Sequence, residues 1–450
     1  MRKDIDMLNG SLWDKILLFV LPLAATTILQ QLFNAADIAV VGRFVGKNAM
    51  AAVGSNSAIT GLVVNLFSGI SLGANVVIAR FIGQGEKKDI GKTIHTSIVF
   101  ALIAGTVTTV IGEIVSAPLL RSLGVPDEVF DMALDYLRIF VFGLPVILLY
   151  NFESAIFRSR GDTKTPLIVL LLSGVVNVGL NLLFVIVFGM AVKGVAYATV
   201  ISNALSCVML FIVLMRAEEP FRITVSSLRI DMRLLSKILK IGLPAGIQGS
   251  MFSIANIIIQ SAVNSLGPDV MAASAAAFNI EIMVYYFCNA FGQATTTFIG
   301  QNYGAGNIPR CRRIFRLSLL MSFCSTGGLS VIVILLGRQL LGIFITEEYV
   351  IDIGMIRLIA IVGFEVLNVL VDASSGAMRG YGRSTSPAVL SLLGICGFRI
   401  VWVYSVFRLY PQFYVLMAAY PISWIITSAM IFIAYFTMLH MMKVKGIYNN

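Results

Sequence analysis

Four polar side chains at helical spacing interrupt an apolar stretch near the N-terminus. They are Thr27, Gln30, Asn34 and Asp37, which stand three, four and three positions apart within residues 14–43. On a helix with about 100° per residue, they fall in one sector of about 80°. If this stretch crosses a membrane, an ionised carboxylate in it costs about 2.5–3.5 kcal/mol, which packing alone does not require. Asp37 is therefore the principal candidate for binding H⁺ or Na⁺.

Polar stripes recur on single faces of four other apolar stretches. Their members are Ser173, Asn177 and Asn181; Ser253, Asn256 and Gln260; Glu281, Tyr285 and Asn289; and Glu365, Asn368, Asp372 and Ser375. Such stripes face a bundle interior or a wet cavity, although Asn, Gln and Ser also join helices for about 0.6 kcal/mol each. Since joining helices needs no charge, we predict ion coupling at Asp37, Glu281, Glu365 and Asp372. We expect a cavity lining of Gln30, Asn34, Asn177, Asn181, Asn256, Gln260, Tyr285, Asn289 and Asn368.

Three charged residues within these stretches leave alternatives open. Glu153 and Asp372 lie nearer the predicted cytoplasmic ends, where packing and function are equal alternatives. Arg399 is predicted to be the counter-ion of one of the acids in the C-terminal half. For an acid that meets an arginine, the alternative is a structural ion pair.

The composition places the chain in a membrane. Of its 450 residues 58% are hydrophobic and 12% are charged, and the mean hydropathy is +0.90. Soluble chains contain about 25% charged residues. The five cysteines are scattered without a CxxC pair, so neither a zinc site nor a disulfide framework is indicated. The net charge of +10 is typical of basic cytoplasmic loops, and no nucleic-acid partner is expected.

Apolar stretches long enough to cross a bilayer, at about 20 residues each, predict an all-α membrane protein with twelve transmembrane helices. They lie at 14–43, 50–81, 93–115, 131–157, 165–189, 194–215, 236–264, 270–300, 314–337, 348–378, 386–407 and 413–440. The two termini and alternate connections together hold 24 of the 33 Lys and Arg residues, and the remaining connections hold six. Basic residues stay on the cytoplasmic side, so both termini are predicted to lie in the cytoplasm of a multi-pass plasma (inner) membrane protein.

The chain repeats itself at a shift of 221 residues. The segment FRSRGDTKTP at 157–166 returns as MRGYGRSTSP at 378–387, and a shift of 222 pairs Pro22 with Pro244. Six spans separate equivalent points, so the two six-helix bundles form a parallel repeat with pseudo-twofold symmetry. We predict an N-terminal lobe at 1–215, a cytoplasmic linker at 216–233 and a C-terminal lobe at 234–450. Glu281 and Glu365 map to Thr60 and Leu144, so the acids do not follow the repeat.

At this point the sequence resembles the MATE (multidrug and toxic compound extrusion) transporters. The resemblance rests on the twelve spans, the parallel halves, NAADIAVVG around Asp37, FIGQNYGAGN at 298–307 and the duplicated RG…P segment. It implies export of small cationic amphipathic compounds driven by inward H⁺ or Na⁺, with Asp37 as a central coupling residue. No cofactor other than the coupling cation is implied. Membrane lipid is the expected surrounding, and a functional monomer is expected.

The sequence departs from the family pattern at three places, which leaves the coupling ion open. Asn177 matches a family asparagine, but Asn181 stands where some proton-linked members carry an aspartate. Residues 241–262 contain no acid, whereas some Na⁺-linked members carry a glutamate there. Those Na⁺-linked members also carry an aspartate on the tenth span, and when the sequences are aligned on Arg379 this aspartate falls at Asn368. These departures favour proton or mixed coupling centred on Asp37.

Three other functions remain as alternatives. A lipid-linked oligosaccharide or other amphipath flippase of the same superfamily would also hold large amphipaths, but its cavity would carry more cations. A major-facilitator transporter would show a Gly/Asp/Arg-rich signature, which RFIGQGEKKDIGK at 80–92 matches poorly. No Ser/His/Asp set, HExxH motif or P-loop is present, so an enzyme is not expected.

Overall fold

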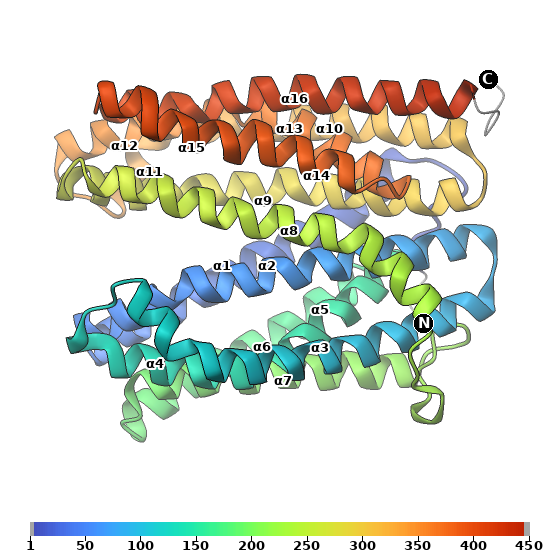
Figure 1. Ribbon diagram of the computed structural model, residues 1–450, viewed down its shortest axis with the longest axis horizontal. Coiled ribbons are helices and arrows are strands. Elements are labelled where there is room, and N and C mark those ends of the chain that lie inside the picture. The colour runs from blue at the N-terminus through green and yellow to red at the C-terminus, as the bar shows by residue number, and fades with distance from the viewer. Residues whose placement is uncertain (1–3, 445–450) are drawn as a thin grey trace. The chain divides into compact units, whose positions relative to one another are not determined.

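The computed structural model describes residues 4–444, and in this range the chain consists of helices and connecting loops without a β-strand (Figure 1). The predicted all-α class is confirmed. Each of the twelve predicted stretches lies on helical structure, because each is a long apolar segment that must satisfy its own backbone hydrogen bonds in a membrane.

One compact unit comprises Ala25–Gly246 with the segment that ends at Ile5. Within it α5 packs against α2, α3 and α7, and α6 packs along α7. Its helices are the C-terminal part of α1 (Trp13–Phe44), α2 (Lys47–Gln84), α3 (Lys87–Ser122), α4 (Asp127–Phe142), α5 (Leu144–Ser159), α6 (Lys164–Leu182), the π-helix η1 (Leu183–Val187), α7 (Ala191–Met215), the 3₁₀ turn η2 (Val225–Ser227) and the N-terminal part of α8 (Met232–Asn264).

The second compact unit comprises Asp6–Ala24 and the chain from Ile247 onward. Here α9 packs against α10, α12 and α13, and α16 covers α12 and α13. Besides the remaining parts of α1 and α8, it holds α9 (Pro268–Gly304), α10 (Ile308–Leu335), α11 (Gly337–Gly342), α12 (Glu348–Ile361), η3 (Val362–Phe364), α13 (Glu365–Gly380), α14 (Thr385–Ser391), η4 (Leu392–Gly397), α15 (Phe398–Trp402), η5 (Val403–Phe407) and α16 (Phe413–Val444).

The helices α1 and α8 each belong to both units. Pro22 and Pro244 lie inside these helices, two residues before the point at which each helix passes from one unit to the other. A proline inside a helix removes one backbone hydrogen bond and permits a kink. The lobes predicted at 1–215 and 234–450 follow the sequence repeat and stay a prediction, since the compact units assign residues 6–24 and 234–246 by their packing instead.

Glycines explain why the first part of α8 packs within the first unit. Gly69 and Gly73 of α2 face Gly242 and Gly246 of α8. A Cβ atom added at Gly73 would stand 2.7 Å from the backbone nitrogen of Gly242, which is closer than real side chains approach. Small residues let the two helix backbones meet in this way. The contact therefore depends on glycine on both helices.

The predicted internal repeat is visible in the backbone. Gly85 lies in the turn between α2 and α3, and Gly306, 221 positions later, lies in the turn between α9 and α10. Both glycines have a φ of 73°. This left-handed conformation favours glycine because a Cβ atom would clash there. The fourth helix of each half also breaks at an equivalent place, between α4 and α5 at Gly143 and between α12 and α13 at η3.

Within residues 4–444, ten helices are long and apolar enough to cross a membrane, and the bent pair α4–α5, which turns by 50°, adds an eleventh span. The predicted span 348–378 falls on α12, η3 and α13, where it is interrupted by η3 and by buried charges.

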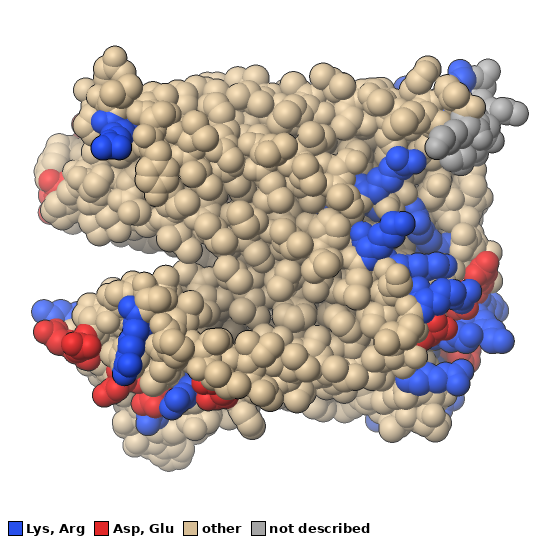
Figure 2. All heavy atoms as spheres, viewed as in Figure 1, with Lys and Arg blue, Asp and Glu red and all other residues tan. Residues whose placement is uncertain are grey.

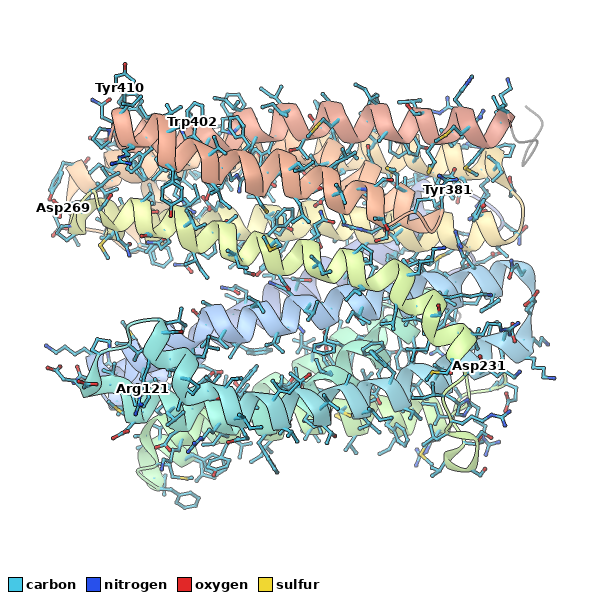
Figure 3. The ribbon with its side chains drawn as sticks, viewed as in Figure 1. Arg121, Asp231, Asp269, Tyr381, Trp402 and Tyr410 are labelled. Atoms are coloured by element: carbon cyan, nitrogen blue, oxygen red, sulfur yellow. The ribbon has the colours of Figure 1, made fainter. Side chains whose placement is uncertain are left out.

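In each unit the face shown in Figure 2 has charged side chains mainly at the helix ends and an uncharged band between them. In Figure 3, Arg121 and Asp231 mark opposite ends of the first unit, and Asp269 and Tyr381 mark opposite ends of the second.

Candidate ion-coupling sites

The Asp37 carboxylate lies inside the first unit and is held by uncharged donors. Its side chain is 6% exposed. The amide nitrogen of Asn181 on α6 donates to Oδ1 at 2.5 Å, and the hydroxyl of Thr199 on α7 donates to Oδ2 at 3.0 Å. Within the described residues, no Lys or Arg lies within ion-pair distance of Asp37. The acid is therefore oriented by hydrogen bonds without being neutralised by a counter-ion.

The hydrogen bonds continue from Asn181 along the contact between α6 and α7. The Asn181 amide also approaches Oδ1 of Asn177 at 3.3 Å, and the Asn177 amide donates to the Ser202 hydroxyl at 3.3 Å. The side-chain oxygen of Asn181 is buried and has no hydrogen-bond partner. An unpaired amide oxygen beside a carboxylate offers oxygen ligands that suit a hard cation such as Na⁺. The same amide oxygen can instead accept a hydrogen bond from a protonated group.

Local helix structure places these groups. On α6, Ser173, Asn177 and Asn181 recur every four residues and so stay on one face of the helix. The π-helix η1 begins two residues after Asn181, at Leu183, and such single-turn π segments frequently accompany functional sites. Tyr136 of α4 also interacts electrostatically with Asp37. Four helices thus contribute to one site.

Four other residues predicted to line a cavity lie on α1 and α8 and are half-buried or exposed. Gln30 is half-buried and Asn34 is exposed. In α8, Asn256 and Gln260 are exposed, and the Gln260 amide donates to Asn264 of the same helix at 2.8 Å. The structure therefore brings Asn177 and Asn181 to Asp37, and their cavity-lining role, like that of the other four residues, stays a prediction.

In the second unit, Glu281 is locked in an ion pair with Arg357. The guanidinium donates from Nη2 to Oε1 at 2.5 Å and from Nε to Oε2 at 3.0 Å, and both side chains are buried. The third guanidinium nitrogen, Nη1, donates to the Ser274 hydroxyl at 2.5 Å. The bidentate contact of Arg357 with Glu281 is the strongest form of carboxylate–arginine contact. Glu281 therefore corresponds to the structural-pair alternative, and ion coupling at this residue stays a prediction.

Arg399, predicted to be the counter-ion of an acid in the C-terminal half, interacts electrostatically with Glu365 and Glu281 but, among the described residues, forms no ion pair with either, so its role stays a prediction. Arg399 is buried, donates from Nε to the Ser423 hydroxyl at 3.1 Å, and places its guanidinium 4.0 Å from the centre of the Tyr420 ring and 5.7 Å from that of Trp424. Of the acids in this half, Glu281 pairs with Arg357 on α12. The two aromatic faces therefore add to the stabilisation of the Arg399 charge.

Glu365 and Asp372 share a second group of polar side chains on α13 and α9. The Asn368 amide donates to Glu365 at 2.9 Å, and the Asn289 amide donates to Asp372 at 3.4 Å. Both acids interact electrostatically with Tyr285. Among the described residues neither acid forms an ion pair. The predicted stripes on these two helices therefore face one another, and their roles in coupling stay a prediction.

Sequence reasoning missed several residues of both sites. Thr199 and Ser202 follow the same three- and four-residue spacing as the other stripes, with Ser206 next, so their pattern was available in the sequence. Arg357 and Ser274 gave a weaker signal, since one arginine within a span does not indicate which acid it meets. Their partners became clear only from the packing of α9 against α12.

Comparisons with known proteins agree with this arrangement. The MatE family model matches residues 22–183 and 244–405, two segments whose starts are 222 residues apart. The chain is 29% identical over 399 residues to "Probable multidrug resistance protein YoeA" of Bacillus subtilis (strain 168), covering 87% of this chain and 86% of that protein. It is 23% identical to the "FAD transporter" of Shewanella oneidensis (strain ATCC 700550 / JCM 31522 / CIP 106686 / LMG 19005 / NCIMB 14063 / MR-1) over 80% of each.

Solved structures share the fold. "Crystal structure of MATE in complex with MaL6" matches with a TM-score of 0.91 at 22% identity, over 98% of this chain and 100% of that chain. "Outward-facing conformation of a multidrug resistance MATE family transporter of the MOP superfamily" matches with a TM-score of 0.89 at 22% identity, over 98% and 99%. At these identities the likeness concerns the fold alone.

Proposed function

This chain belongs to the MatE family, as its motifs predicted, and from that premise we propose that it exports cationic amphipathic compounds in exchange for H⁺ or Na⁺ by alternating access. The similar proteins that carry names of drug resistance support export of small compounds. They do not favour the flippase alternative. We propose no enzymatic activity.

The observation that carries the proposal is the buried, unpaired carboxylate of Asp37. A charge in an apolar protein interior is costly unless a cation binds it or a proton neutralises it. Asn181 and Thr199 hold this carboxylate in place without neutralising it. Asp37 therefore favours a bound H⁺ or Na⁺, and a cationic substrate competes for the same negative charge. Loss of the ion on one side of the membrane would restore the charge that a substrate needs.

The energetics set the steepness of export. Exchange of one H⁺ for one monovalent cation moves no net charge, so the membrane potential of about 2.3 kcal/mol per charge per 100 mV does not contribute. The proton gradient supplies about 1.4 kcal/mol per pH unit, which supports about tenfold accumulation. A second ion bound at Glu365 or Asp372 would increase this ratio. We propose a monomer in the plasma membrane with both termini in the cytoplasm.

Transport by the Asp37→Asn variant tests the proposal. Proteoliposomes with an imposed pH or Na⁺ gradient are scored for ethidium movement, which also identifies the coupling ion. We expect the variant to lose gradient-driven export while it folds and inserts normally. The matched control is Glu113→Gln, because Glu113 is a partly exposed acid on α3 that pairs with Arg138. Unchanged ethidium export by Asp37→Asn would refute the coupling role.

A further inference from the structure

The helix α5 buries a carboxyl group that the Asp37 site does not use. Glu153 is 0% exposed, and neither of its carboxylate oxygens has a hydrogen-bond partner. An ionised carboxylate in such a place would lose the solvation of water without gaining a partner. The surroundings of Glu153 therefore stabilise its neutral, proton-bearing form. A carboxyl that is protonated in one conformation and rehydrated in another is a proton carrier.

The groups around Glu153 can exchange protons but do not neutralise a charge. The thiol of Cys207 on α7 and the hydroxyl of Tyr150 on α5 interact electrostatically with the carboxyl. The hydroxyls of Tyr150 and Ser154 are themselves buried without hydrogen-bond partners. Arg158, five residues further along α5, forms no ion pair with Glu153 among the pairs of the described residues. Among the described residues, the neighbouring helices α2 and α3 add no titratable group that acts on Glu153.

A row of polar contacts leads from Asp37 toward Glu153, entirely within the first unit. Asn181 binds Asp37, and one helical turn away Asn177 binds Ser202. A further turn along, the Ser206 hydroxyl donates to the Ser173 hydroxyl at 2.6 Å. The three α6 positions of these contacts span about 12 Å along the helix, given a rise of about 1.5 Å per residue. We name this row the α6–α7 polar seam.

The end of the seam lies beside Glu153. Cys207, which interacts electrostatically with Glu153, directly follows Ser206 on α7, and α7 packs against α5. In the orientation proposed above, α5 runs toward its cytoplasmic end at Ser159, while Asp37 lies toward the opposite end of α1. The seam therefore runs from the coupling acid toward the cytoplasmic half of the first unit.

We propose that Glu153 is a second proton-binding carboxyl, which receives the proton that Asp37 gives up and releases it toward the cytoplasm. This inference rests on the proposed function and commits it to H⁺ as a coupling ion. Once rehydrated, Glu153 first releases its own proton toward the cytoplasm. The proton of an Asp37 oxygen then passes along the hydroxyl groups of the seam to the vacated Glu153 oxygen and leaves by the same route, so that both carboxyl groups end deprotonated. No electrons are transferred, and the charge that Asp37 gains is available to the cationic substrate.

Packing does not account for the acid at this position. The repeat places Ser374 of α13 where α5 has Glu153, and Ser374 is also fully buried. The next residues, Ser154 and Ser375, are serine in both halves. The same scaffold position is thus filled in the second unit without a carboxyl group. The seam is also specific to the first unit, because its Asn177 and Asn181 have no amide counterparts at Arg399 and Val403.

Infrared difference spectroscopy of the purified protein tests the proposal at the level of single carboxyl groups. Adding ethidium to the wild type at fixed pH should remove the C=O bands of two protonated acids. Asp37→Asn should lack one band, and Glu153→Gln should lack the other.

In proteoliposomes, Glu153→Gln should slow export driven by a pH gradient by about tenfold or more, with Glu113→Gln as the control. Glu153→Asp keeps a carboxyl group and should restore part of the rate.

The outcomes separate this inference from the proposed function. If Glu153→Gln keeps both bands and the wild-type rate, the inference is wrong while Asp37 coupling stands. If the wild type exports only on a Na⁺ gradient, the inference is also wrong, and the Na⁺ form of the proposed function remains. If Asp37→Asn changes neither bands nor export, the proposed function itself fails. If Glu153→Gln does not fold, the Glu153→Asp variant replaces it in the test. An aspartic acid in place of Glu153 should shift the frequency of one of the two C=O bands, and two unshifted bands would contradict the inference.

Discussion

The sites around Asp37 and Glu281, one in each half of the molecule, have opposite electrostatic arrangements on the same scaffold. The first unit surrounds the Asp37 carboxylate with amide and hydroxyl donors. The second unit pairs Glu281 with Arg357 and stacks Arg399 on aromatic rings. One site carries an acid without a counter-ion, whereas the other holds a closed ion pair with a second cation beside it.

The repeat shows which positions changed. A shift of 221 places Arg357 where the first unit has Tyr136, and Ser423 where it has Ser202. A shift of 222 places Arg399 where it has Asn177. The π-helix η4 lies between Ser391 and Arg399 and has no counterpart in α6, which accounts for the extra residue.

The difference separates a group that can change its charge from one that cannot. In the proposed cycle, removing the ion from Asp37 would leave a single charge that substrate or water could reach in another conformation. Removing a proton or charge from the Glu281–Arg357 pair would leave a buried charge alone, which is strongly unfavourable. The first arrangement suits a coupling site, and the second suits a fixed structural element.

Breaking the ion pair should have the largest effect on stability. Arg357→Met leaves Glu281 buried without its counter-ion, and we expect the free energy of unfolding to fall by about 3–5 kcal/mol. Unfolding in detergent mixtures, followed by circular dichroism, measures this loss. The double variant Glu281→Gln with Arg357→Met removes both charges and should recover most of the stability.

An exposed arginine is the matched control for this prediction. Arg338 pairs with Glu348 and Asp352 at 2.6 Å each, but all three side chains are at least half exposed. Water and salt screen such pairs, so Arg338→Met should change the free energy of unfolding little. Equal losses for the Arg338 and Arg357 variants would contradict the structural role assigned to the buried pair.

Neutralising Asp37 should have a smaller effect on stability, although it should abolish transport. Asn has the same size as Asp and carries no charge, so Asp37→Asn keeps the packing and removes an unpaired buried carboxylate. We expect the free energy of unfolding to stay within about 1 kcal/mol of the wild type or to rise. The same unfolding assay measures it. A loss comparable to that of Arg357→Met would show that Asp37 is structural and would remove the contrast between the two halves.

Much of this arrangement could be predicted from the sequence, because long apolar segments and charges within them are local signals. The helices, the repeat and the position of Asp37 were all evident in this way, as were the stripes that hold Asn177 and Asn181. The pairing of Glu281 could not be predicted, since Arg357 and Arg399 both lie within spans and only packing distinguishes them. The exchange of helix segments between the compact units also depends on tertiary contacts, such as that of Phe19 with Phe298.

The smallest expected effect concerns the N-terminal segment, where Asp4 belongs to the first unit and Asp6 to the second. Burial raises the pKa of Asp4, despite Arg160 at 3.6 Å. Burial would also raise the pKa of Asp6, but hydrogen bonds from the Asn9 side chain and from the Leu8 and Asn9 backbones lower it overall. The two acids, two residues apart, should therefore affect stability in opposite directions.

The pH dependence follows from the sign of each shift. The contribution of Asp4 is present below its unfolded pKa and is lost as the pH rises through its higher folded pKa, so Asp4→Asn should raise stability at neutral pH. The contribution of Asp6 is present above its unfolded pKa and is lost as the pH falls through its lower folded pKa, so Asp6→Asn should lower stability at neutral pH. Each change should stay below about 0.5 kcal/mol, because both groups are partly exposed and screened. Unfolding followed from acid to neutral pH measures both variants, and shifts of the same sign would show that the two units do not hold this segment as described.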